Sequence, residues 1–218
     1  MSSVTIRTLI VDDQAMVRAG LHMLLAEEPD IDVVAEASNG VEAIAQAARY
    51  RPDVILMDIR MPELDGLEAT RRVLAADRTA KVLILTTFNL DDYVYEALRA
   101  GASGFVLKDE PPEQLIAAVR TIAAGDALLS PSITRSVIAH FTRHQRQPPP
   151  RTLDTLTSRE MDVYRLIAAG LSNAEIGREL FISDTTVKTH VTRLLQKLGV
   201  RDRAQAIVMA YQSGLLDR

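Results

Sequence analysis

Hydrophobic and polar positions follow two different periodicities along the first half of the chain. Five short aliphatic runs have strand character: Ile6–Val11, Asp32–Glu36, Val54–Met57, Lys81–Leu85 and Gly104–Leu107. Between these runs, apolar residues recur at the spacing of a helix, as Val17, Leu21, Leu24 and Leu25 do. Five strands that alternate with helices predict an α/β fold, a doubly wound five-stranded parallel sheet with helices on both faces. A ligand site is then expected beyond the carboxyl ends of the strands, where the strand order reverses.

The pattern changes after residue 127. Residues 131–143 favour one more helix, and the three consecutive prolines at 148–150 block helix and sheet alike. Such a segment is typical of an extended linker. We therefore expect a first domain over residues 1–127 and a linker over 128–152, with a possible helix and a proline-rich segment.

The remainder of the chain, residues 153–218, is expected to form a small all-α domain. Its helical patterns cover residues 158–169, 173–180, 184–198 and 202–213. Thr157 and Ser172 each precede a glutamate by three residues, which is the capping-box pattern at the start of a helix.

Composition excludes several classes of chemistry. The 218 residues include no Cys, which excludes disulfide scaffolds, cysteine-ligated metals and cysteine nucleophiles. No apolar run approaches the ~18–20 residues that a membrane span needs. The amino terminus also lacks a basic stretch followed by an apolar one. We therefore expect a cytoplasmic protein with no membrane partner.

Charge is distributed unevenly between the two halves. Residues 1–127 hold 12 basic and 21 acidic side chains, a net charge of −9, whereas residues 128–218 hold 13 and 8, a net charge of +5. An acidic module attracts cations and a basic one attracts phosphate, so the two modules are expected to have different partners. Chance variation of surface charge would give the same asymmetry.

Polar residues stand at the carboxyl ends of four predicted strands. They are Asp12, Asp13, Asp58, Thr86 and Lys108. Three carboxylates in one crevice repel one another, and a hard divalent cation such as Mg²⁺ relieves the repulsion while it keeps positions for phosphate. Together these groups suit a phosphoryl group bound to one carboxylate oxygen. For any single residue, an ordinary solvated charge at a strand end is the alternative.

These residues, together with the segment Met-Pro-Glu-Leu-Asp-Gly at 61–66, resemble the signature of bacterial response-regulator receiver domains over residues 4–125. The resemblance implies a flavodoxin-like fold. It also implies that Asp58 is the phosphoacceptor, which attacks a phosphohistidine on a sensor histidine kinase. Mg²⁺ or Mn²⁺ would be held by Asp13 directly, by Asp12 through water, by Asp58 and by the backbone carbonyl of Arg60.

The same resemblance implies a switch that responds to phosphorylation. Thr86 and Lys108 would contact the phosphoryl oxygens, and Phe105 occupies the aromatic switch position, where it lacks the hydroxyl of a tyrosine. The resemblance also suggests a cis peptide bond between Lys108 and Asp109. Phosphorylation would then promote a homodimer through the first, fourth or fifth helix.

Residues 173–198 have the dimensions of a helix-turn-helix. In the second of these helices the apolar stripe consists of Val187, Val191, Leu194, Leu195 and Leu198. The opposite face carries short hydroxyls, one lysine and no acidic residue in its exposed middle, which suits the major groove of double-stranded DNA. A solvated face on a small helical bundle is the alternative.

The segments 156–160, 170–176 and 186–191 resemble LuxR-type DNA-binding domains, and the two modules together resemble a NarL/FixJ-family response regulator. By that resemblance, the residues that face bases are Lys188, Thr189 and Thr192. Those nearer phosphates are Thr185, His190 and Arg193. The closing helix would supply a dimer contact through Ile207, Val208 and Tyr211, unless it packs only onto its own bundle.

The expected function is a DNA-binding transcription regulator of a two-component system, with no enzymatic activity beyond its own phosphorylation and dephosphorylation at Asp58. A metal-dependent phosphohydrolase would also use the acidic crevice, but residue 60 is Arg rather than a second acid/base carboxylate. A ligand-responsive LuxR-type regulator would need an aromatic-lined cavity, and only 4% of the residues are aromatic. An RNA-binding antiterminator is disfavoured by the helix-turn-helix spacing.

Overall fold

The structure is a computed structural model that describes residues 5–86, 91–125, 151–213 and 215. The chain divides into two compact units, Met1–Leu128 and Leu129–Arg218, and each has its own hydrophobic core. The helix expected at 131–143 and the proline-rich segment lie outside the described residues. Within the described ranges, no helix has the length and apolar character to cross a membrane.

The first unit contains a five-stranded sheet in which every strand is parallel to its neighbours. The strands are β1 (Ile6–Val11), β2 (Ile31–Ala37), β3 (Val54–Asp58), β4 (Lys81–Thr86) and β5 (Gly104–Leu107). Their order across the sheet is β2-β1-β3-β4-β5. All five predicted strands and the predicted fold class are confirmed. The order reverses between β1 and β3, so the expected ligand crevice lies at the carboxyl ends of these two strands.

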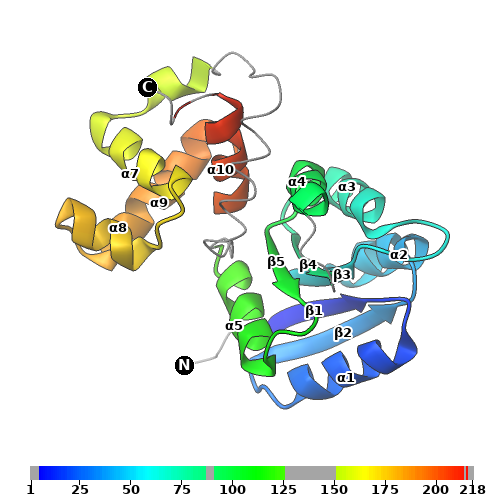
Figure 1. The fold of residues 1–218 in the computed structure, drawn as a ribbon. Coiled ribbons are helices and arrows are strands. Elements are labelled where there is room, and N and C mark those ends of the chain that lie inside the picture. Colours follow the sequence, from blue (N-terminus) through cyan, green and yellow to red (C-terminus); the bar gives the residue numbers. More distant parts are fainter. Residues whose placement is uncertain (1–4, 87–90, 126–150, 214, 216–218) are drawn as a thin grey trace. The chain divides into compact units, whose positions relative to one another are not determined.

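Helices cover both faces of this sheet, as predicted. They are α1 (Ala15–Ala26), α2 (Gly40–Tyr50), α3 (Gly66–Ala76), α4 (Asp91–Ala100) and α5 (Pro112–Ala123). Figure 1 shows α1 and α5 on one face and α2, α3 and α4 on the other. Because β3 lies in the middle of the sheet and both of its faces are covered, all five of its residues are buried, Asp58 included.

The second unit is helical throughout its described residues. A 3₁₀ turn (Arg151–Thr155) precedes α7 (Ser158–Ala168), α8 (Asn173–Leu180), α9 (Asp184–Leu198) and α10 (Arg203–Gln212). Both predicted capping boxes form. The hydroxyls of Thr157 and Ser172 accept from the backbone N–H groups of Glu160 and Glu175, and the carboxylate of each glutamate accepts from the backbone N–H of the capping residue. The stripe predicted on α9 is also confirmed, because Val187, Val191 and Leu194 are buried in the core of this unit.

One glycine fixes the loop that follows β3. The N–H of Gly66 donates to the carbonyl of Ile59 at 2.9 Å, and a Cβ atom at Gly66 would overlap the carbonyl oxygen of Asp58. The side chain of Asp65 caps α3 by accepting from the N–H of Glu68 at 2.8 Å. The start of α3 therefore packs directly against the carboxyl end of β3 and holds the backbone of Asp58 in position.

We predict that Gly66→Ala destabilises the first unit by about 2 kcal/mol, because the added methyl group forces backbone atoms apart. Gly20→Ala is the matched control. Gly20 lies inside α1, nothing lies within 4 Å of its would-be Cβ, and alanine should stabilise the helix there by about 0.5–1 kcal/mol. Denaturant unfolding followed by circular dichroism measures both changes. Equal stability of the two variants would contradict the close packing at Gly66.

Candidate functional site

The three predicted carboxylates meet at the carboxyl ends of β1 and β3. Asp12, Asp13 and Asp58 each offer an oxygen atom within 4.8 Å of the others. Asp12 is fully buried and Asp58 is 7% exposed, whereas Asp13 is exposed. The cluster is therefore open to solvent on the side of Asp13 and closed by the sheet on the side of Asp12.

Lys108 lies between the two buried carboxylates. Its Nζ is 2.5 Å from Oδ2 of Asp12 and 3.0 Å from Oδ2 of Asp58. The backbone N–H of Lys108 donates to the carbonyl of Thr86 at 2.8 Å, which ties the end of β5 to the end of β4. The remaining oxygens of the two carboxylates bond to the backbone: Oδ1 of Asp58 accepts from the N–H of Ile59, and Oδ1 of Asp12 from that of Gln14.

Burial and charge act in opposite directions on these groups. Burial is the largest cause of a raised pKa at Asp58, and the nearby carboxylate of Asp12 adds to it, although the bond to Lys108 opposes the shift. Burial also favours the neutral amine of Lys108, but the hydrogen bonds to Asp12 and Asp58 outweigh it and raise its pKa. Three carboxylates and one ammonium leave an excess of negative charge, which favours binding of a cation.

Thr86 and Phe105 lie on β4 and β5, the two strands beyond β3 in the sheet. Thr86 ends β4 and is 9% exposed, and Phe105 lies in β5 and is 3% exposed. In the strand register Phe105 is paired with Ile84, and Thr86 with Leu107, the residue before Lys108. The sheet therefore links the residue that ends β4, the buried ring and the lysine.

Arg60 lies two residues beyond Asp58, in the loop between β3 and α3. It lines a cavity of about 540 Å³ together with Asp13, Met61, Pro62 and Asp65. Of the three carboxylates only Asp13 lines this cavity, so the cavity lies on the exposed side of the cluster.

One expectation from the family resemblance is wrong. The described residues contain no cis peptide bond, so the bond between Lys108 and Asp109 is trans. The trans form is the ordinary state of a bond that does not precede proline.

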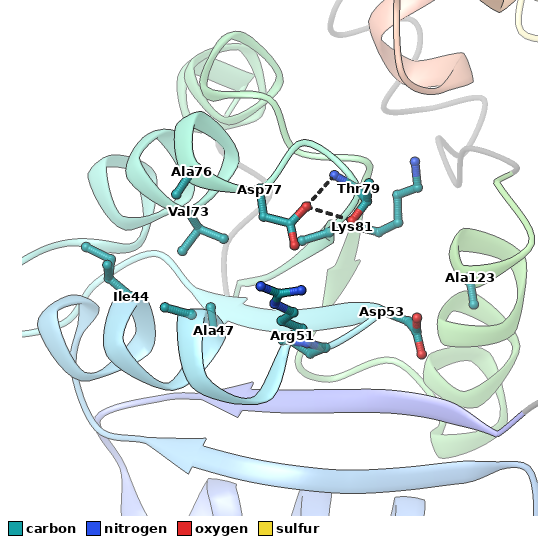
Figure 2. A pocket seen from close by; sticks show the side chains of 13 residues that line it. Ile44, Ala47, Arg51, Asp53, Val73, Ala76, Asp77, Thr79, Lys81 and Ala123 are labelled. Carbon is teal, nitrogen blue, oxygen red and sulfur yellow. Dashed lines mark hydrogen bonds between the residues drawn. The ribbon is translucent and has the colours of Figure 1, made fainter.

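A second cavity, of about 660 Å³, lies at the opposite ends of the strands (Figure 2). It is lined by residues at the ends of α2 and α3 and at the starts of β3 and β4, among them Arg51, Asp77 and Lys81. Asp77 accepts two hydrogen bonds from Thr79, and these bonds, with a smaller contribution from Arg51, lower its pKa. The carboxylate therefore stabilises the turn before β4, and this cavity lies apart from the acidic cluster.

In the second unit, α8 and α9 form the predicted helix-turn-helix. The hydroxyl of Ser183 caps α9 by accepting from the N–H of Thr186. Of the six residues predicted to contact DNA, five are exposed and His190 is half-buried. The exposed residues are Thr185, Lys188, Thr189, Thr192 and Arg193.

Two details of this face were not anticipated. Nζ of Lys188 lies 3.3 Å from Oδ2 of Asp184, an exposed i,i+4 pair that its spacing alone would have revealed. Such a pair contributes little free energy, so Lys188 can exchange its partner for another acceptor. The hydroxyls of Thr189 and Thr192 donate to the carbonyls one turn earlier, at 3.0 and 2.9 Å. Their hydroxyl oxygens retain lone pairs that can accept from a ligand.

The residues expected to form a dimer contact on α10 have contacts within their own unit. Ile207 is 2% exposed and belongs to the core, and Val208 is also buried. The hydroxyl of Tyr211 donates to the carbonyl of Ala168 at 2.8 Å, and burial raises the pKa of Tyr211 to about 12. A role of these residues in dimerisation stays a prediction.

The two units match two families. Residues 8–120 match the response regulator receiver domain, and residues 154–210 match the bacterial regulatory proteins of the luxR family. A parallel sheet with an acidic pocket at its switch point, followed by a helix-turn-helix, defines the class of two-component transcription regulators.

Whole-chain comparisons give the same result. The chain is 41% identical to the uncharacterised transcriptional regulatory protein YxjL of Bacillus subtilis, over 99% of this chain and 100% of that protein. It is also 41% identical to the transcriptional regulatory protein LiaR of the same organism, over 97% of this chain and 100% of that protein. The crystal structure of response regulator ChrA, from a heme-sensing two-component system, is similar with a TM-score of 0.53, 37% identity and coverage of 97% of this chain and 99% of that one. The chain belongs to the response regulators that join a receiver domain to a LuxR-type DNA-binding domain.

We predict that Asp58→Asn stabilises the first unit at pH 7 by on the order of 1 kcal/mol when a chelator is present. In the wild type, Asp58 carries a buried negative charge that Asp12 repels, and the amide of the variant removes this charge. Lys108 keeps Asp12 as its partner in the variant. Because the pKa of Asp58 is raised in the folded state, the penalty exists above that pKa and disappears as the pH falls and Asp58 becomes protonated.

Denaturant unfolding at pH 7 and at about pH 4, near the reference pKa of an unfolded aspartate, measures the difference between the variant and the wild type. The difference should shrink at the lower pH. A variant that is less stable than the wild type at pH 7 would show that the ion pair with Lys108 outweighs the cost of burying Asp58.

Proposed function

We propose that Asp58 is the phosphoacceptor of this regulator and that a sensor histidine kinase is its phosphodonor. The observation that carries the proposal is the placement of Asp58, a buried carboxylate at the end of the central strand with the ammonium of Lys108 at 3.0 Å. Asp12 is fully buried and Asp13 is exposed, whereas Asp58 ends the central strand with Lys108 beside it and directly precedes Ile59 and Arg60, which line the cavity.

The chemistry is transfer of a phosphoryl group from nitrogen to oxygen. A carboxylate oxygen of Asp58 forms a bond to phosphorus as the bond from phosphorus to the imidazole nitrogen of the donor breaks. The donor ring, protonated on its other nitrogen, keeps the electron pair of the broken bond and leaves as neutral imidazole. Lys108 then neutralises one charge on the phosphoryl oxygens, and the hydroxyl of Thr86 donates to another. This role makes the protein a substrate of phosphotransfer and not an enzyme that acts on external substrates.

The donor set fits Mg²⁺ or Mn²⁺. All three side chains offer hard oxygen ligands, and Oδ2 of Asp12 is buried without a hydrogen bond of good geometry, although Lys108 lies 2.5 Å away. Asp13, Asp58 and the backbone carbonyl of Arg60 would hold the ion, with Asp12 acting through water. When bound, the ion neutralises charge on the carboxylates and on the incoming phosphate.

Dimerisation is the proposed consequence of phosphorylation. Thr86 moves toward the phosphoryl group, and the buried ring of Phe105 takes the space that it leaves. The contacts between β4 and β5 support this coupling, because Phe105 is paired with Ile84 on β4 and the N–H of Lys108 donates to the carbonyl of Thr86. The packing of β5 and its adjoining helices changes as a result.

Double-stranded DNA is the proposed partner of the second unit, and the cytoplasm is the location that this proposal implies. The exposed face of α9 supports it, since Lys188 has two hydrogens to spare beyond its bond to Asp184 and guanine presents two acceptors in the major groove. Lys188, Thr189 and Thr192 read bases, while Thr185, His190 and Arg193 contact phosphates.

Phosphorylation tests the first part of the proposal. Incubation of the full chain with Mg²⁺ and acetyl phosphate should add one phosphate, detected as a mass increase of the intact protein. Asp58→Asn should abolish the increase, and a chelator should do the same because uncompensated carboxylates repel the donor. Asp53→Asn is the control: Asp53 immediately precedes β3 at the far end of the sheet, where its carboxylate accepts from the N–H of Arg7. Full labelling of Asp58→Asn would overturn the assignment.

Dimerisation is tested by sedimentation velocity with and without the phosphate mimic beryllofluoride. We expect the mimic to raise the dimer population of the wild type and to leave Thr86→Ala unchanged. A shift from 1% to 99% dimer-competent chains requires about 5.5 kcal/mol of differential stabilisation, to which the few charge-assisted contacts of the phosphoryl group contribute. An unchanged mass across the working concentration range would contradict the coupling.

Two variants of α9 separate reading of bases from attraction to phosphate. Lys188→Ala should weaken binding to the specific duplex by about 1–3 kcal/mol and relax specificity. Arg193→Ala should weaken binding to all duplexes alike and reduce the slope of log affinity against log salt by about one. Fluorescence anisotropy with specific and scrambled duplexes over a salt series measures both. Equal losses on both duplexes for Lys188→Ala would show that it does not read bases.

A further inference from the structure

Phe181 is the most exposed large hydrophobic side chain in the described part of the chain. The residue is 94% exposed, compared with 88% for Met16 and 72% for Met23. It lies in the turn between α8 and α9, three residues before the first helical residue of α9. A phenyl ring in this position buries no apolar surface within its own domain.

The backbone of Phe181 is also in an unfavourable conformation. The residue ends α8 with φ 55° and ψ 44°, the left-handed region that favours glycine or asparagine. Its N–H donates to the carbonyls of Gly177 and Arg178. A bulky residue that strains the backbone and packs against nothing contributes no stability, so its benefit lies in what it contacts outside the domain.

The exposure of the ring is fixed by its neighbours rather than by fraying of the turn. Leu180 and Ile182 both pack against the core of the domain. The guanidinium of Arg159 donates to the carbonyl of Leu180 at 2.7 Å. The N–H of Ile182 donates to the carbonyl of Gly177 at 2.9 Å. The two residues are packed so closely that a Cβ atom on Gly177 would lie only 2.8 Å from the carbonyl oxygen of Ile182. With both flanking residues held inward, Phe181 points to solvent.

The location of the ring identifies its ligand. A helix-turn-helix protein places the amino-terminal end of its recognition helix at the base edges, and Phe181 lies at that end of α9. Base edges in the major groove carry hydrogen-bonding groups, which a phenyl ring cannot satisfy, and one apolar group, the methyl of thymine. We propose that Phe181 is a specificity-determining residue that contacts a thymine methyl group at the edge of each half-site. This inference rests on the proposed binding of DNA by α9.

The test compares thymine with uracil, which differ by that methyl group. The phosphorylated full chain first selects duplexes from a randomised pool, and each thymine of the selected duplex is then replaced singly by deoxyuridine. At one position per half-site the wild type should lose about fourfold in affinity, the value of one buried methyl group. Phe181→Gly should bind the thymine duplex about fourfold more weakly and should not distinguish it from the uridine duplex.

Phe181→Gly is suited to this test because glycine adopts the left-handed conformation without strain. Its melting temperature should equal or exceed that of the wild type, so weaker binding cannot be attributed to unfolding. Phe181→Tyr, which keeps the ring, should retain the discrimination. Met23→Ala, which removes an exposed apolar side chain from the other domain, should leave affinity unchanged.

Each other outcome overturns the inference in a distinguishable way. If Phe181→Gly binds as the wild type does while Lys188→Ala loses specificity, α9 binds DNA and the ring contacts something else. If Phe181→Gly weakens thymine and uridine duplexes equally and the wild type does not distinguish them, the ring contacts the sugar-phosphate backbone and reads no base. If the wild type selects no duplex, the proposed DNA binding is wrong, and this inference with it.

Discussion

The site depends on one interaction, the contact of the Lys108 ammonium with two buried carboxylates, Asp12 at 2.5 Å and Asp58 at 3.0 Å. Two carboxylates cannot both stay charged in a buried pocket without a cation. Lys108 supplies a single positive charge, and burial still raises the pKa of Asp58. The pocket is therefore stable enough to fold and yet retains a negative charge excess, which suits it to a divalent cation and to a phosphoryl group that brings new contacts.

The parallel sheet connects the charged cluster to the neighbouring strands. Because all five strands run in one direction, their carboxyl ends meet at one edge, and residues far apart in the chain become neighbours. The backbone bond from Lys108 to Thr86 and the burial of Phe105 join β4 and β5 to the charged cluster. A change in the charge at Asp58 can therefore alter the packing of two strands and their helices, which is the physical basis of the proposed switch.

The second domain uses the opposite arrangement. Its core and its caps hold α8 and α9 firmly, while its polar face and the ring of Phe181 remain exposed. In the first domain the carboxylates of Asp12 and Asp58 are buried and repel one another, whereas in the second most of the residues proposed to contact DNA are exposed.

The sequence by itself determined the strands, the helix-turn-helix, the capping boxes and the polar residues at the strand ends, because periodicity, capping and strand-end position are local properties. It also identified the family through motifs that span nearly the whole chain. Only the tertiary structure decided the trans bond after Lys108, the bridging position of that lysine, the burial of Ile207 and the exposure of Phe181. These features depend on the packing of residues distant in sequence or on a single backbone angle. The pattern of hydrophobic and polar residues along the chain determines neither the packing nor the angle.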